Sequence, residues 1–181
     1  MPKIVEEHSY NGAKERIARL GLEPVLEELR TILTGFALRV EEKRDANGGA
    51  AVRRLIDERF PGSWVKVAAG DIDWTRCNTV NGTRVCVGVE IQMSARSDLL
   101  VVDIIHLRGA IERGGIDVGV LVVPSDKLGV FLTDRGPRMA DAKKHVRAAR
   151  ADDLPILLIA IEHDGPGLAL AKQLKRPRKK S

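Results

Sequence analysis

The sequence predicts an α/β domain, in its narrower sense α+β, in which a mixed β-sheet is flanked by helices. In the first third of the chain, apolar residues recur at helical spacing, with breaks at Gly35 and at Asn47-Gly48-Gly49. The middle third alternates with period two around Asn81-Gly82, which is the strongest short-range signal for a β-hairpin. The last third alternates helical segments with continuous apolar strands, as expected for strands buried on both faces.

The expected helices begin and end at recognisable signals. Pro24 is tolerated in a first turn, and Pro61-Gly62 ends the third helix. Ser97-Asp98 is a good helix start, and Gly114-Gly115 is a good stop. The sequence predicts helices at residues 12–20, 22–33, 50–60, 99–113 and 139–150. It predicts strands at residues 64–69, 71–77, 84–92, 118–123 and 155–161, with an ambiguous segment at 36–40 and a loop at 128–138.

Composition excludes several classes of protein. The 181 residues suit one domain, expected over residues 1–171, followed by a basic and disordered tail over residues 172–181. That tail holds six of the 30 Lys and Arg residues and no acid, so the basic character belongs to the tail. With 44% hydrophobic and 30% charged residues, the chain is neither disordered nor fibrous. Because no apolar run reaches a membrane span of about 18 residues and no signal pattern opens the chain, we expect a cytoplasmic protein without a membrane partner.

Acidic residues on the two hairpin strands are the first chemical signal. A two-residue turn at Asn81-Gly82 places Asp73 opposite Glu90 and Asp71 opposite Gln92, on one face. Opposed carboxylates about 5 Å apart repel unless a proton or a cation lies between them. Oxygen ligands without His or Cys favour Mg²⁺. A solvated polar face is the alternative, but the mainly apolar surroundings of Glu90 favour a site.

These residues resemble a known active site. Asp73 followed by Glu90-Ile91-Gln92 resembles the active-site hairpin of restriction-endonuclease-like nucleases, the PD-(D/E)XK superfamily, with Gln92 where Lys is usual. The Glu-x-Gln variant resembles the BglII and BstYI group of type II restriction endonucleases, which is related to BamHI. Further similarity lies in Ile72-Asp73-Trp74 and in residues 116–124 and 153–159, within a region of about residues 57–164.

The resemblance implies a restriction-endonuclease-like fold and a Mg²⁺-dependent cut of double-stranded DNA at a short palindrome, with a GATC core. Asp73 and Glu90 match the two metal-site carboxylates, and the carbonyl oxygen of Ile91 matches a direct metal ligand. Gln92 matches the residue that holds the attacking water, and Glu58 matches an auxiliary polar residue on the preceding helix. The expected catalytic residues are therefore Asp73, Glu90, Gln92 and Glu58.

Two loops are expected to read DNA bases in the major groove. The first follows the catalytic strand and contains Ser94, Arg96 and Ser97; the second contains Thr133, Asp134 and Arg135. Ser97 has the alternative role of a helix cap, and Asp134 with Arg135 could form a local ion pair in a surface turn. Palindromic cutting requires two-fold symmetry, so we expect a homodimer. The strongly apolar helix at residues 99–111 is the preferred interface, with an ordinary core helix as the alternative.

Other interpretations remain open from the sequence. A nuclease of the same fold could act in DNA repair or mobile-element processing, and a DNA-binding module without catalysis is a third class. Cys77 and Cys86 lie opposite each other in the same hairpin, where a disulfide is geometrically possible, but a cytoplasmic protein should keep them reduced. His106 is expected to be a core or interface histidine.

Overall fold

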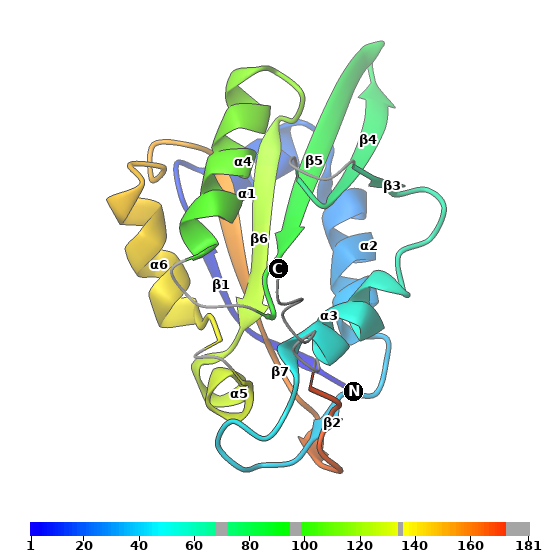
Figure 1. Cartoon of the computed structure of the whole chain (residues 1–181). Coiled ribbons are helices and arrows are strands. Elements are labelled where there is room, and N and C mark those ends of the chain that lie inside the picture. Colours follow the sequence, from blue (N-terminus) through cyan, green and yellow to red (C-terminus); the bar gives the residue numbers. More distant parts are fainter. Residues whose placement is uncertain (68–71, 95–98, 134–135, 173–181) are drawn as a thin grey trace, which may run out of the picture.

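A computed structural model describes residues 1–67, 72–94, 99–133 and 136–172. Its centre is a six-stranded mixed sheet in the order β1-β7-β6-β5-β4-β3, and β2 and β8 form a small second sheet (Figure 1). The strands are β1 Lys3–Ser9, β2 Arg39–Val40, β3 Val65–Lys66, β4 Trp74–Val80, β5 Thr83–Ile91, β6 Val118–Pro124, β7 Ile156–Glu162 and β8 Gly165–Pro166. The helices are α1 Ala13–Arg19, α2 Glu23–Thr34, α3 Gly49–Asp57, α4 Leu100–Glu112, α5 Asp126–Phe131 and α6 Met139–Ala148.

Helices cover both faces of the large sheet, with α4 and α6 on one face and α1 and α2 on the other (Figure 1). Alternation along β6 shows how the two cores share one strand, because successive side chains in a strand point to opposite faces. Val120 and Val122 join the core under α1, α2 and α3, whereas Leu121 and Val123 join the core under α4 and α6. This layered arrangement confirms the predicted fold class.

The hairpin has the predicted register. Asn81 and Gly82 have φ angles of 50° and 80°, as a type I′ turn requires. Trp74 pairs with Val89 and Cys77 pairs with Cys86, so Asp73 extends the same ladder toward Glu90. β5 then pairs in parallel with β6, which makes it an interior strand of the sheet. The turn chemistry therefore fixes which acidic residues meet.

The structure differs from expectation at several places. β1 was not predicted, and it pairs antiparallel with β7 at the sheet edge with an irregularity between Ile4 and Glu6. The expected loop at residues 128–138 begins as part of α5, which Ser125 caps by accepting a hydrogen bond from the backbone N–H of Leu128. Cys77 and Cys86 form a disulfide, so the expectation of two free thiols is wrong. Their directly opposed positions bring both sulfur atoms to one face.

No helix within the described residues is both long and apolar enough to cross a membrane.

Candidate active site

Asp73 and Glu90 lie together as the register predicts. The Asp73 carboxylate accepts a hydrogen bond of 2.8 Å from the backbone N–H of Ile91, which fixes one of its oxygens, Oδ2, against β5. The Glu90 carboxyl hydrogen-bonds to Asp73, and its residue is only 4% exposed. Two acidic side chains from adjacent strands therefore meet in a largely buried position. This geometry supports the carboxylate pair that the sequence predicted.

Helix α4 adds two further groups to the same place. His106 Nδ1 lies 3.1 Å from Glu90 Oε1. Glu90, Asp103 and His106 each offer one ligand atom, and these atoms all lie within 4.8 Å of one another. Asp103 Oδ2 is buried and has no hydrogen-bond partner among the described residues. The side chain of Gln92 hydrogen-bonds to Asp103, so the third residue of the predicted motif also joins the cluster.

Helix α3 contributes a positively charged side chain, Arg53, to the cluster. Arg53 Nη2 lies 2.8 Å from Asp73 Oδ1, and Nη1 donates to the carbonyl oxygen of Ile91. Its Nε donates to Asp57 Oδ1 over 3.0 Å, and the same oxygen accepts from Trp74 Nε1 over 2.9 Å. A single guanidinium thus binds three acceptors, and Trp74 holds one of them in place.

Burial and mutual repulsion set the charges of the three acids. Burial, the largest cause, together with the hydrogen bond and the negative charge of Asp73 raises the pKa of Glu90 to about 10. Burial and the charge of Asp73 raise the pKa of Asp103 to about 7. Burial opposes ionisation of Asp73 too, but the hydrogen bond and charge of Arg53 hold the pKa of Asp73 below its usual value. Without a metal ion, Glu90 therefore keeps its proton at neutral pH.

The residues fit a divalent cation. Three carboxyl groups converge, and among the described residues Arg53 is the one permanent positive charge in contact with them, so this part of the site has an excess of acid. Asp103 Oδ2 finds no donor in the described part of the chain, and a cation would satisfy it. Carboxylate and carbonyl oxygens suit Mg²⁺ or Mn²⁺, and the imidazole of His106 also suits Mn²⁺ or a later transition metal.

The raised pKa values predict that the metal-free protein loses stability as pH rises. Between pH 4.5, the ordinary pKa of a free Glu, and about 10, the folded state retains the Glu90 proton that the unfolded chain releases. Asp103 adds to this slope up to a pH of about 7, and Asp73 adds none because it is ionised in both states. Urea unfolding in EDTA at pH 5.5, 7.0 and 8.5 should give a steadily falling free energy of unfolding.

The control for this prediction is Glu90→Gln, which keeps the shape of the side chain but does not titrate. Its free energy of unfolding should depend less on pH over the same range. An equally steep dependence in the variant would show that Glu90 is not the source of the slope.

The other predicted site residues are placed as follows. Glu58 caps the end of α3 with a side chain that is 60% exposed, and its 3.8 Å ion pair is with Arg54. Within the described residues no hydrogen bond or ion pair joins Glu58 to the cluster, whereas Arg53 of α3 contacts Asp73 and Ile91. Ser94 and Thr133 lie beside the start of α3: the backbone N–H of Thr133 donates to Asn47, and Gly49 approaches Ser94 closely. Asp71, Arg96, Ser97, Asp134, Arg135 and the tail from residue 173 lie outside the described residues.

Sequence reasoning missed Arg53, Asp103 and the role of His106. Asp103 and His106 are three residues apart on a helix whose neighbouring positions are almost all apolar. Residues three apart share a helix face, so two polar side chains within that apolar segment were a usable signal. Arg53 had no such signal, because Asp73 and Ile91, its partners in the cluster, are distant from it in sequence.

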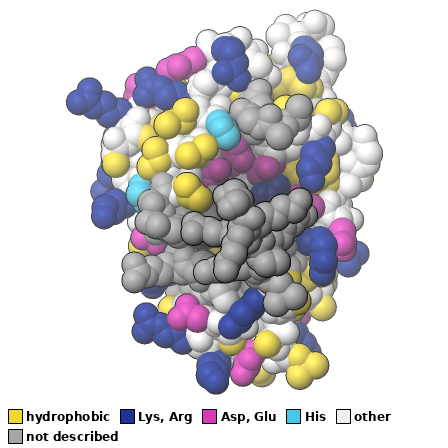
Figure 2. Space-filling model, viewed as in Figure 1, with side chains coloured by type: hydrophobic (Ala, Val, Ile, Leu, Met, Phe, Trp, Pro, Cys, Tyr) yellow, Lys and Arg dark blue, Asp and Glu magenta, His cyan; other side chains and the backbone are white. Residues whose placement is uncertain are grey.

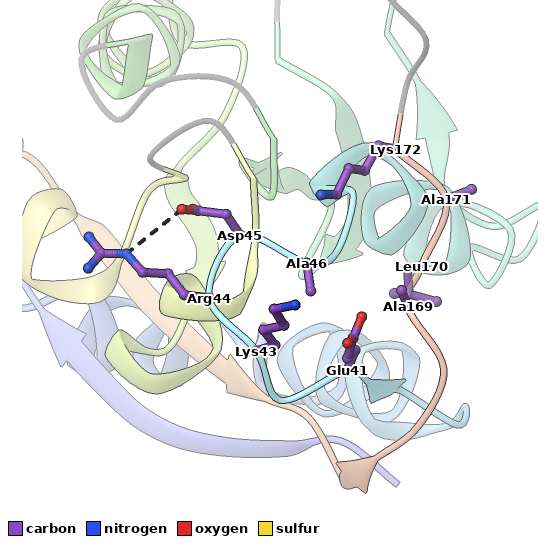
Figure 3. Close-up of a pocket in the computed structure, with 9 residues that line it drawn as sticks. All are labelled: Glu41, Lys43, Arg44, Asp45, Ala46, Ala169, Leu170, Ala171 and Lys172. Atoms are coloured by element: carbon purple, nitrogen blue, oxygen red, sulfur yellow. Dashed lines mark ion pairs between the residues drawn. The ribbon is translucent and has the colours of Figure 1, made fainter.

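A separate pocket of about 500 Å³ lies between the segment of residues 41–46 and residues 169–172 (Figure 3). Lys43, Arg44 and Lys172 line it together with Glu41 and Asp45, and Arg44 pairs with Asp45. None of the residues of the carboxylate cluster lines this pocket. The acidic cluster, and not this pocket, is therefore the candidate active site.

Comparison with known proteins identifies the family of this chain. No curated protein matches the sequence. A family model described as restriction endonuclease BglII/BglIII matches residues 5–161, which is most of the chain and includes both hairpin strands and α4. The match confirms the resemblance to the BglII group that the sequence indicated. The chain therefore belongs to the BglII/BglIII family of restriction endonucleases, which are nucleases acting on DNA.

Proposed function

We propose that this protein is a type II restriction endonuclease that hydrolyses both strands of DNA at a short palindromic site, in the cytoplasm, with Mg²⁺ as its cofactor. The observation that supports this most is the meeting of Asp73 with Glu90 beside the Ile91 carbonyl, in a chain of this family. The GATC core of the site is what the resemblance implies.

Each residue has a role that its position supports. Asp73, Glu90 and the carbonyl oxygen of Ile91 would hold the ion. When bound, Mg²⁺ supplies positive charge to the scissile phosphate and lowers the pKa of a water molecule. Gln92 orients the attacking water through its amide and cannot accept a proton at neutral pH. Asp103 contacts Gln92 and has a buried oxygen without a partner among the described residues, so it is placed to accept a proton as the water attacks.

The DNA would lie across the edge of the sheet at the carboxyl ends of β5 and β6. The segments that contain Ser94 and Thr133 both lie beside the start of α3, on the side where Arg53 reaches the cluster. We propose that Ser94, Thr133 and the neighbouring Arg96, Ser97, Asp134 and Arg135 contact bases. Bidentate contacts of Arg with guanine and acceptance by Asp from cytosine would provide the specificity.

Incubation of the full chain with unmethylated phage DNA and Mg²⁺, followed by sequencing of fragment ends, tests the proposed function. Discrete fragments with one shared terminal sequence would support restriction. Structure-dependent nicks without a shared sequence would favour a repair nuclease instead. Binding without cleavage under every divalent ion would leave only a DNA-binding module.

A homodimer follows from the palindrome, and α4 has a surface suited to it. Leu99, Val102 and Ile105 are 45%, 44% and 53% exposed and lie three residues apart, so they form an apolar stripe. Figure 2 shows hydrophobic side chains gathered beside acidic side chains and a histidine on this face. Since α4 also provides Asp103 and His106, pairing through this stripe would bring two active sites near one interface.

Ile105→Glu should weaken the dimer about 100-fold, because a charge would be buried at the centre of the interface. Sedimentation velocity across a concentration series would measure the shift to monomer. Leu168→Glu is the control, since Leu168 is 90% exposed outside α4 and its replacement should not change the dimer. A wild-type chain that remains monomeric at all concentrations would contradict the proposed interface.

A further inference from the structure

Arg53 binds two of the three oxygen groups that we assign to the metal ion. Its Nη2 lies 2.8 Å from Asp73 Oδ1, and its Nη1 donates to the Ile91 carbonyl. The Arg53 side chain is 20% exposed and that of Asp73 is 24% exposed, so bulk water screens this contact only in part. The guanidinium therefore already occupies oxygen atoms that we assign to the metal ion.

A metal ion that takes these oxygens competes with the guanidinium for them. Mg²⁺ lies about 2.0–2.1 Å from its oxygen ligands. An ion bound by both Asp73 Oδ1 and the Ile91 carbonyl would draw on the oxygen lone pairs that now accept from Nη2 and Nη1, and it would lie close to both nitrogen atoms. Two cations at that separation also repel each other strongly in a partly dry site.

Arg53 has a second anchor that does not involve those oxygens. Its Nε donates to Asp57 Oδ1, which lies four residues along the same helix and is also bound by Trp74. Lys66 Nζ lies 3.6 Å from the other oxygen of Asp57. Arg53 can therefore release Asp73 and Ile91 while it stays paired with Asp57.

We propose that Arg53 is the resident cation of this site in the metal-free protein, and that a divalent ion binds by displacing its guanidinium from Asp73 and Ile91. The proposal rests on the function proposed above. In the metal-free state, Arg53 holds the Asp73 carboxylate in place through its 2.8 Å contact. Metal loading then exchanges one cation for another, which makes metal affinity weaker than the oxygen ligands alone would give.

Calorimetric titration of the full chain with MgCl₂ and MnCl₂, without DNA, tests the exchange. Arg53→Gln should bind the ion at least tenfold more tightly than the wild type, because no guanidinium has to leave. Its melting temperature in EDTA should fall, and the rise on adding Mg²⁺ should be larger than in the wild type. Arg54→Gln is the matched control: Arg54 is 71% exposed and pairs with Glu58, so its affinity should stay at the wild-type value.

Arg53→Lys separates exchange from simple charge repulsion, and it serves if the Gln variant does not fold. An ammonium keeps the charge but loses the fork that reaches two acceptors. Its metal affinity should lie between those of the wild type and Arg53→Gln. Equal affinity for the wild type and the Lys variant, or weaker binding in either variant, would overturn the exchange while leaving the proposed function intact. If neither wild type nor variant binds a divalent ion, the proposed metal chemistry fails as well.

Discussion

Asp73→Asn should lower the rate of DNA cleavage about 10³-fold, which corresponds to about 4 kcal/mol of lost transition-state stabilisation. The change removes a negative charge from the group that we assign to the metal ion. It preserves the shape of the side chain, because the Asn oxygen can still accept from the backbone N–H of Ile91 or from Arg53. Fold and DNA binding should therefore survive while chemistry is lost. Cleavage of an end-labelled duplex in Mg²⁺, under single-turnover conditions, measures the rate.

Asp153→Asn is the matched control for this substitution. Asp153 is exposed and precedes β7, whereas Glu90 lies near the end of β5. Since β5, β6 and β7 run parallel, these two positions lie toward opposite ends of the sheet. The control should cleave at the wild-type rate. Unchanged cleavage by Asp73→Asn, with an unchanged Mg²⁺ requirement, would remove Asp73 from the metal site.

The part of the site that sequence could predict depends on one local rule. A two-residue turn with positive φ at Asn81 and Gly82 fixes the register of both strands. Once the register is fixed, the alternation of side chains along each strand places Asp73 and Glu90 on the same face of the hairpin. No long-range information is needed for this step. The helices at α1, α2, α4 and α6 followed in the same way from apolar spacing and from breaks at glycine and proline.

The local sequence pattern could not predict that α3 places Arg53 in the site, nor that β1 forms the edge of the sheet. Arg53 reaches the cluster only because α3 packs across the end of β5, and nothing in residues 49–57 specifies that placement. β1 is a sheet edge with mixed burial and an irregular register, so its residues lack clean alternation. Glu58 is expected because the resemblance implies an auxiliary polar residue on the helix before the hairpin. A counter-ion such as Arg53 is recognised only once its partners are in place.

Packing at the start of α3 holds the site together through its backbone. Asn47 is fully buried, and its side chain binds the backbone of Glu41, Phe131 and Leu170. Gly49 then passes so close to the strand exit that an added β-carbon would lie 2.0 Å from the Met93 carbonyl oxygen and 3.0 Å from the α-carbon of Ser94. Both are backbone atoms, which cannot rotate away.

Gly49→Ala should destabilise the protein by about 3 kcal/mol, the upper end for overpacking, and lower its melting temperature by about 6–12 °C. Cleavage should also fall about 10²-fold at temperatures where the variant stays folded, since a shift of about 1 Å at Met93 moves the adjacent Gln92 and Ile91. Thermal unfolding and single-turnover cleavage measure the two effects. Gly62→Ala is the control, because its β-carbon would meet nothing within 4 Å. A Gly49→Ala chain with wild-type stability would show that the strand exit yields freely, and the close approach would then have no part in holding Ile91 and Gln92 in position.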